Sequence, residues 1–183
     1  MLLEGKIDML SDVSLTPERQ EQLLFSSLPM GSEEYYACVS SRQNAGVTAE
    51  DLSTFNGKQI GVNGGSYQEA LLREWLERNR IEAEITELSG TQFESIEMLH
   101  NGEIDVLVDL DLYGLAEDVS PVCAIGSSDI YFAVSQSRPE RVNELNSAMA
   151  RIREENRNYN QHLQEKYFNA NLVNLDFSHN EVN

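Results

Sequence analysis

Three groups of polar residues in this sequence have the types and spacing to bind a small charged molecule. In the first, Ser14 and Arg19 lie on either side of Thr16 and Pro17, which predict the start of a helical turn. The planar guanidinium of an arginine can donate two parallel hydrogen bonds to one carboxylate. We therefore expect Ser14 and Arg19 to form an anion-binding pair. Taken alone, an arginine on a surface helix is the more common explanation of such a segment.

The second group is the turn that follows a predicted strand at 59–63. Its glycines let the backbone approach a ligand closely, and a helix that begins after them presents unpaired N–H groups. The pattern differs from the G-x-G-x-x-G motif of dinucleotide-binding proteins and from the P-loop. A well-capped turn without a ligand explains it equally well. If the turn binds a ligand, the residues concerned are Gly65, Ser66, Tyr67 and Gln68.

The third group consists of Asp109 and Asp111, which follow an apolar stretch predicted as a strand at 104–108. Ligands of open α/β sheets bind beyond the carboxyl ends of the strands. Either carboxylate could therefore receive an ammonium group. The alternative is that both are solvated loop acids, which are common in an acidic chain.

Patterns for catalysis or metal binding are missing from the sequence. The three histidines pair with no recognisable nucleophile, and no G-x-S-x-G motif occurs. There is no CxxC motif and no cluster of histidine and cysteine, so a zinc site is not expected. Cys38 and Cys123 could form one disulfide or remain as two buried thiols. We expect no catalytic residue, no bound metal and no cofactor.

The charge of the chain restricts its partners. With 13 basic and 31 acidic residues, the net charge is −18, which disfavours nucleic acid and anionic membrane surfaces. An anionic ligand would have to be held by local cations or by helix N-termini. No apolar run approaches the roughly 18 residues of a membrane span, and no signal peptide is visible. Contact with a membrane is expected only through segments outside this sequence.

The elements that must position these groups alternate between strand and helix, which predicts an α/β fold with parallel strands. The region from 60 to 108 has the pattern β-α-β-α-β. Its strands are predicted at 59–63, 84–88 and 104–108, and its helices begin with S-x-x-E or T-x-x-E capping boxes at Ser66 and Thr91. Residues 93, 96 and 99 are predicted to form the apolar face of the second helix, which ends at Gly102.

Further elements are predicted on both sides of this region. Strands are expected at 7–10, 35–40 and 130–134, and a capping box at Thr48–Asp51 should open a short helix. Gly5 resembles the C-cap of a preceding helix. A long helix is expected to start around Pro139, with an apolar face through Val142, Leu145, Met149 and Ile152. A second helical stretch with Tyr159, Leu163 and Tyr167, and a helix start at Ser178, are also predicted.

Six segments match a known pattern in a fixed order. They are residues 3–8 (LEGKID), 15–19 with 24–29 (LTPER and LFSSLP), 51–62 (DL with NGKQIGV), 65–69 (GSYQE), 101–106 (NGEIDV) and 131–135 (YFAVS). Each segment is modest alone, but together they are specific. The chain resembles the bacterial extracellular solute-binding proteins of the polar amino-acid type, family 3.

The resemblance implies a periplasmic-binding-protein-like fold of type II, with two lobes built on open sheets. Lobe one would comprise residues 1–37 and 129–183, and lobe two residues 38–128. About a third of the domain, which normally precedes the first residue here, would be missing from lobe one. An incomplete lobe exposes a sheet edge and apolar surface, so we expect this lobe to pair with another chain, as in a homodimer.

The resemblance also implies roles for the candidate residues. Arg19 would bind the carboxylate of the ligand, with Ser14 beside it, and residues 65–68 would contact the ligand from lobe two. The aspartate that binds an ammonium group in the family aligns with Leu110, which lies between Asp109 and Asp111. Asp12 stands where the family usually has a small residue, so the ligand need not be an ordinary α-amino acid.

The chain continues past 166–168 through 175–181, which resembles sensor domains of bacterial membrane signalling proteins. We therefore predict an extracytoplasmic domain that binds and senses an amino acid or a similar polar solute, anchored by segments outside this sequence and without enzymatic activity. One alternative is the solute-binding receptor of an ABC transporter. Others are an enzyme on the same scaffold, of the dehydratase or transglycosylase kind, and an interaction module without a small ligand.

Overall fold

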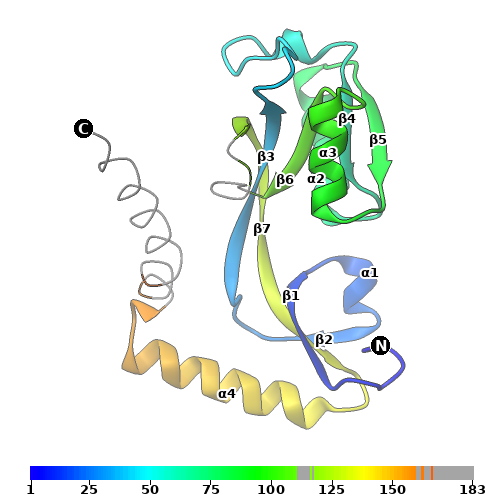
Figure 1. Cartoon of the computed structure of the whole chain (residues 1–183). Coiled ribbons are helices and arrows are strands. Elements are labelled where there is room, and N and C mark those ends of the chain that lie inside the picture. The colour runs from blue at the N-terminus through cyan, green and yellow to red at the C-terminus, as the bar shows by residue number, and fades with distance from the viewer. Residues whose placement is uncertain (111–115, 117, 160–161, 163–165, 167–183) are drawn as a thin grey trace, which may run out of the picture. The chain divides into compact units, whose positions relative to one another are not determined.

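The computed structural model of the chain describes residues 1–110, 116, 118–159, 162 and 166. It divides into two compact units (Figure 1). Unit 1 contains residues 1–32 and the chain from 129 onward, and unit 2 contains residues 33–128. The chain therefore enters and leaves unit 2 once each, so that unit 2 is an insertion in the sequence of unit 1.

Unit 2 is a four-stranded sheet, extended by a fifth strand, with one helix on each side. Its elements are β3 (Gly31–Ser40, which begins in unit 1), the 3-10 helix η1 (Leu52–Phe55), β4 (Gln59–Asn63), α2 (Tyr67–Asn79), β5 (Glu84–Leu88), α3 (Gln92–Asn101), β6 (Val106–Leu110) and β7 (Val119–Ser135, which ends in unit 1). β4 is the central strand and pairs in parallel with β5 and β6, whereas β3 runs antiparallel to β6. The predicted β-α-β-α-β pattern and the α/β class are confirmed.

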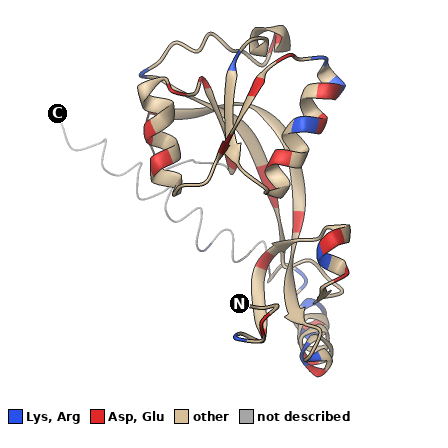
Figure 2. Ribbon diagram, turned by 90° about the vertical axis from the view of Figure 1, so that its right-hand side faces the viewer, with Lys and Arg blue, Asp and Glu red and all other residues tan. Residues whose placement is uncertain are grey.

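The sheet of unit 2 buries apolar side chains on both of its faces. Along β6, Val106 and Val108 join a cluster with Leu72 of α2, whereas Leu107 joins a second cluster with Leu99 of α3. All five side chains are at most 2% exposed. Because successive strand residues point to opposite faces, this alternation places α2 and α3 on opposite sides of the sheet, as Figure 2 shows.

Unit 1 is built from β1 (Met9–Ser14), the single-turn helix α1 (Pro17–Gln20), β2 (Leu23–Phe25), the last part of β7 and α4 (Pro139–Glu155). Both β1 and β2 pair antiparallel with β7. The buried apolar cluster of this unit is small and consists of Leu2, Val13 and Ala133. α4 has no fully buried residue.

Several strand boundaries differ from the predicted ones. β1 starts at Met9 instead of residue 7 and continues to Ser14, through a register shift between Leu10 and Val13 where Asp12 has a φ of +64°. The strand predicted at 104–108 starts at Val106 and ends at Leu110. The strand predicted at 130–134 is only the end of β7, which has 17 residues.

The predicted starts of α1, α2, α3 and α4 are confirmed, the last at Pro139. Thr16, Ser66 and Thr91 are N-caps, and Gly102 has the expected positive φ. The capping box at Thr48 is wrong, because Asp51 caps η1 by accepting a hydrogen bond from Ser53 N. Phe93 is 71% exposed and does not belong to the apolar face of α3.

Two predicted segments near the end of the chain cannot be compared with the structure. Leu163 and Tyr167 of the second helical stretch, and the helix start at Ser178, lie outside the described residues. Within the described residues, no helix combines the length and apolar character that crossing a membrane requires.

Candidate functional site

The structure brings Ser14 and Arg19 together in unit 1. Ser14 is the last residue of β1 and is buried, and Arg19 lies in α1 after the cap formed by Thr16. The guanidinium Nη1 of Arg19 donates a 2.9 Å hydrogen bond to the carbonyl oxygen of Ser14. This bond uses one of the five N–H donors of the guanidinium, and no described residue bonds the other donors, whose fork geometry suits a carboxylate.

The turn at Gly65 to Gln68 lies at the N-terminus of α2 in unit 2. Gly65 has a φ of +68°, a conformation that a residue with a side chain rarely adopts. The Ser66 hydroxyl accepts a 3.3 Å hydrogen bond from Glu69 N and donates a 2.5 Å bond to the carbonyl oxygen of Asn63. Ser66 is thus a structural cap, and its hydroxyl proton is engaged within the turn.

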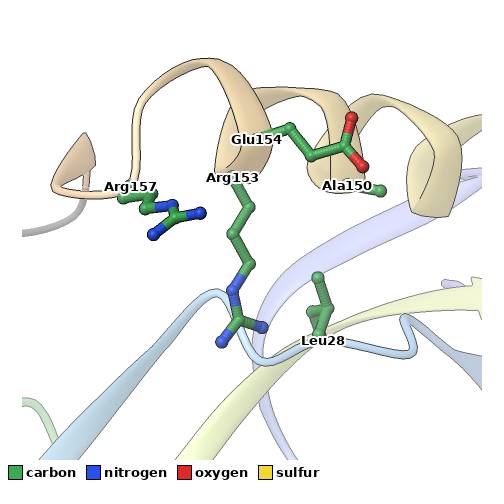
Figure 3. Close-up of a pocket in the computed structure, with 5 residues that line it drawn as sticks. All are labelled: Leu28, Ala150, Arg153, Glu154 and Arg157. Carbon is green, nitrogen blue, oxygen red and sulfur yellow. The ribbon is translucent and has the colours of Figure 1, made fainter.

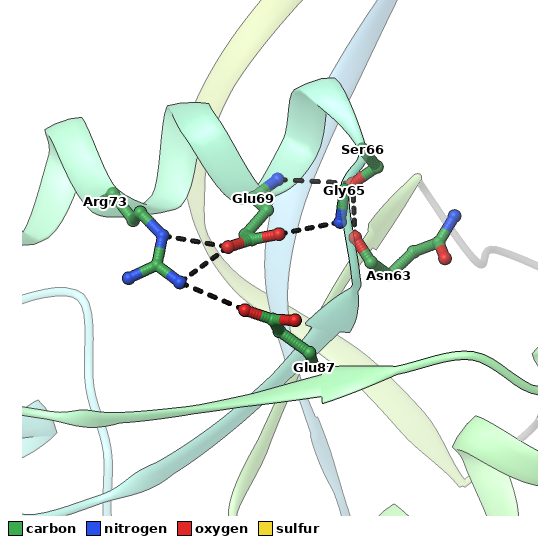
Figure 4. A network of polar contacts seen from close by, with 6 residues as sticks. All are labelled: Asn63, Gly65, Ser66, Glu69, Arg73 and Glu87. Atoms are coloured by element: carbon green, nitrogen blue, oxygen red, sulfur yellow. Dashed lines mark hydrogen bonds and ion pairs between the residues drawn. The ribbon is translucent and has the colours of Figure 1, made fainter.

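Glu69 does not form the predicted capping box. Its carboxylate accepts a 2.7 Å hydrogen bond from the N–H of Gly65, one residue before the N-cap. The other carboxylate oxygen accepts two bonds from Arg73, which also approaches Glu87 at 3.4 Å (Figure 4). The hydrogen bond from Gly65, followed by that from Arg73, holds the pKa of Glu69 below its ordinary value. A buried, ionised carboxylate therefore fixes the backbone of the turn.

This network changes what the turn offers to a ligand. The N–H groups of Gly65 and Glu69 are already bound inside the turn. The N–H groups of Tyr67 and Gln68, at the first two positions of α2, lack intrahelical partners, as expected for a helix start. These two half-buried residues are the ones best placed to donate to a polar ligand group. The Glu69 carboxylate nearby makes the position less favourable for a full negative charge.

Asp109 lies at the end of β6, where it is half-buried and opposite Tyr36 of β3. One carboxylate oxygen accepts a 3.2 Å hydrogen bond from the side-chain amide of Gln92, and the other accepts from Leu110 N at 2.7 Å. These contacts fix the carboxylate but leave lone pairs on both oxygens for a ligand N–H. Asp111 lies outside the described residues.

The sequence prediction missed several residues of these constellations. Arg73 and Gln92 were not singled out, because an arginine or a glutamine on a helix carries no signal by itself. The spacing of four between Glu69 and Arg73 on one helix is a recognisable sign of an ion pair. No such local sign connects Gln92 to Asp109, since they lie 17 positions apart.

Neither a metal site nor a disulfide is found in the described part of the chain. No three histidine, cysteine, aspartate or glutamate side chains gather there to hold a metal ion. Cys38 is buried and Cys123 is half-buried, and neither is in a disulfide, so of the two alternatives the structure has two thiols. Burial raises the pKa of the Cys123 thiol, which keeps it protonated near neutral pH.

Comparisons with solved structures relate this fold to amino-acid-binding proteins. The probable amino-acid ABC transporter extracellular-binding protein ytmK from Bacillus subtilis is 17% identical, with a TM-score of 0.73 over 91% of this chain and 73% of that chain. Tv2483, bound to L-arginine, is 20% identical, with a TM-score of 0.72 over 92% and 68% of the two chains. The ancestral amino acid-binding protein AncCDT-1, a precursor of cyclohexadienyl dehydratase, is 22% identical, with a TM-score of 0.69 over 91% and 71%.

These similarities confirm the periplasmic-binding-protein-like fold that the sequence predicts, with a chain that covers only part of each relative. No curated protein sequence matches the chain significantly. The family model for bacterial extracellular solute-binding proteins, family 3, matches residues 1–170, which is nearly the whole sequence. The chain belongs to family 3 of the bacterial extracellular solute-binding proteins.

Proposed function

We propose that the chain binds an amino acid or a similar polar solute outside the cytoplasm. The observation that carries the proposal is Arg19, whose guanidinium is fixed to the carbonyl oxygen of Ser14 and keeps free donors for a carboxylate. In a chain of net charge −18, such a locally held cation is what an anionic group requires. Membership of family 3 supports both the solute-binding role and the extracytoplasmic location.

In this proposal, units 1 and 2 correspond to a partial lobe one and to lobe two, which contribute different polar groups. Arg19 and Ser14 bind the carboxylate of the solute, and the turn at 65–68 donates the N–H groups of Tyr67 and Gln68. Asp109, together with Asp111, accepts from an ammonium group. An amino acid is the simplest solute that carries both charged groups, and the relative Tv2483 is bound to L-arginine.

Thermal-shift measurements with amino acids, polyamines and small organic acids test the proposal. A solute that binds the folded state raises the melting temperature by mass action, corresponding to about 2.7 kcal/mol at 100 times its Kd. We expect Arg19→Ala to lower the affinity about 100-fold, because a desolvated charge pair is lost, and Arg19→Lys to restore only part of it. Arg151→Ala, an exposed change in unit 1, is the matched control. If no solute shifts the melting temperature of the unchanged protein, the proposal is wrong.

We further propose that binding serves a bacterial signal-transduction protein, of which this chain is the sensing domain. The support is the resemblance of the segment 175–181 to sensor domains of bacterial membrane signalling proteins. The receptor of an ABC transporter is the second candidate, favoured by the similarity to ytmK. Sequencing the gene and its neighbours separates the two: a kinase or cyclase domain in the same reading frame supports the sensor, and an adjacent permease gene supports the receptor.

The proposal makes the chain a binding protein and not an enzyme. Both carboxylate oxygens of Asp109 accept hydrogen bonds, which suits an acceptor for a ligand ammonium group. The similarity to the dehydratase precursor AncCDT-1 favours the enzymatic alternative. Asp109→Asn distinguishes the binding protein from the enzyme. In a binding protein, this change should weaken solute binding, and the solute should not be converted by either the unchanged protein or the variant. Turnover of a bound solute that Asp109→Asn abolishes would establish the enzyme.

A further inference from the structure

Unit 1 has an apolar groove between α4 and the segment that joins β2 to β3. The groove has a volume of about 560 Å³, and its apolar lining includes Met30, Phe132, Leu145, Met149, Ile152 and Tyr159. Ile152 is 41% exposed and Tyr159 is 39% exposed. Since α4 has no fully buried residue, its apolar side is only partly covered by its own unit.

The rim of this groove carries cations that form no ion pair within the part of the chain that the structure describes. Arg153 and Arg157 line an adjoining hollow together with Leu28, Ala150 and Glu154 (Figure 3). By contrast, Arg138 and Arg141, near the other end of α4, pair with Asp8, Glu140 and Glu144. Among the described residues, the arginines at and just beyond the end of α4 thus differ from those near its start, which form ion pairs within the unit.

The charge at the end of α4 differs from that of the whole chain. Between Met149 and Tyr159 there are three arginines and two glutamates, whereas the chain has 13 basic and 31 acidic residues. Two molecules of net charge −18 repel each other. They can approach most easily through a surface where the local charge is not negative, and this segment has that property.

We propose that two copies of the chain dock through this surface, with α4 of each copy against the groove of the other. A contact around a two-fold axis needs a patch that is complementary to itself. Here Ile152 and Tyr159 supply apolar side chains for the partner's groove, and adjacent residues of opposite charge, Arg153 and Glu154, can pair across the axis in both directions. A 17-residue helix is about 25 Å long. The contact is therefore toward the small end of specific interfaces, and the dimer dissociates on dilution.

Sedimentation equilibrium of the whole chain tests the dimer. The mass should rise with concentration from 20.6 kDa toward twice that value. Ile152→Glu places a charge in the apolar contact and should raise the dissociation constant at least about 10-fold. Phe93→Glu changes an apolar residue of unit 2 that is 71% exposed, and it should leave the mass unchanged. A monomer up to about 1 mM, or equal behaviour of the two variants, overturns the proposal.

A charge exchange decides the matter if Ile152→Glu fails to fold. Arg153→Glu gives three consecutive glutamates at 153–155 and Glu154→Arg gives two adjacent arginines, so each variant repels a second copy of itself. Mixed in equal amounts, the two variants present opposite charges to each other. We expect each alone to dimerise at least about 10-fold more weakly than the unchanged chain, and the mixture to form a heterodimer. If the mixture has the same mass as the separate variants, the proposal is overturned. That outcome would also be expected if the groove binds a segment of another protein instead of a second copy.

Discussion

Units 1 and 2 bury apolar surface in different ways. In unit 2, two clusters lie on the two faces of a largely parallel sheet, and each is covered by a helix of at least ten residues. In the described part of unit 1, three antiparallel strand segments surround a cluster of Leu2, Val13 and Ala133. The stability of the chain therefore depends mainly on unit 2.

The same difference applies to the candidate ligand-binding residues. The turn at Gly65 is held by the Glu69 network and by a helix anchored through the buried Leu72 and Trp75. Arg19, by contrast, lies on a single turn of helix with no buried residue and is fixed through one hydrogen bond to Ser14. The candidate ligand-binding residues of the two units thus differ in how firmly the fold holds them in place.

The largest expected difference between the units is in the cost of core truncation. Leu72→Ala removes a side chain with 0% exposure and should lower the free energy of unfolding by about 3–4 kcal/mol. Leu2→Ala, the same change in the small cluster of unit 1, should cost about 1–2 kcal/mol, because fewer neighbours lose contacts. Denaturant unfolding of both variants measures the two values. Equal costs would mean that unit 1 is packed as well as unit 2.

Glycine replacement separates the units by their tolerance of added volume. A Cβ at Gly61 would lie 2.6 Å from Ile104 Cδ1 and 3.0 Å from Leu88 Cδ1, so Gly61→Ala should cost about 2 kcal/mol. At Gly31 the nearest atom would be 3.7 Å away, and Gly31→Ala should be neutral within about 0.5 kcal/mol. Thermal unfolding distinguishes the two. A destabilised Gly31→Ala together with a neutral Gly61→Ala would reverse the comparison.

The Glu69 network predicts a pH-dependent contribution to the stability of unit 2. Since the pKa of Glu69 is lower in the folded chain than its ordinary value of 4.5, its contribution is fully present above that value and is lost as the pH falls through the folded pKa. Glu69→Gln should therefore cost about 1 kcal/mol at pH 7 and much less at low pH.

Glu87→Gln is the control for that measurement, because Glu87 is 61% exposed and lies 3.4 Å from the same arginine. We expect it to change the stability by less than about 0.5 kcal/mol at either pH. Urea unfolding at pH 7 and at low pH gives both values. A Glu69→Gln effect that is the same at the two pH values would show that the ionised carboxylate has no part in holding the turn.

The smallest predicted difference concerns helix capping. Thr91→Ala removes the hydroxyl that accepts from Glu94 N, while the backbone N–H at position 91 can still donate to the Glu94 carboxylate. The change should cost about 1 kcal/mol. Thr16→Ala removes the cap of the four-residue helix α1 and should cost about 0.5 kcal/mol, at the low end for such caps. The two melting temperatures test this order. A larger loss for Thr16→Ala would show that α1 is more important to unit 1 than its exposure suggests.

The elements of unit 2 could be predicted where local signals agree. β4 and β5 have the predicted bounds, because alternating apolar residues lie between clear turn signals. β6 starts two residues late, since Ile104 is apolar and 1% exposed but packs in the core before the strand begins. Most of β7 was missed because Pro121 and Gly126 interrupt its sequence. Its extension depends on pairing with distant strands, which sequence periodicity does not report.

The sequence predicted which residues belong to the candidate site, but it did not predict all of the hydrogen bonds that they form. The five-residue spacing from Ser14 to Arg19 indicated a pair, and the structure gives the hydrogen bond. The S-x-x-E pattern at Ser66 correctly indicated a cap. It could not show that Glu69 binds Gly65, because reaching one residue further back depends on the φ of +68° at that glycine.

The insertion of unit 2 within the sequence of unit 1 has a consequence for the order of folding. During synthesis, residues 33–128 emerge as one continuous stretch and can fold before the rest of the chain is made. β1 cannot pair at that stage, because its partner residues in β7, such as Val134 for Met9, are translated more than a hundred positions later. Until β7 has been made, the segment with the exposed Met9 and Leu10 has no strand to pair with. We therefore expect the N-terminal segment of nascent chains to need chaperones.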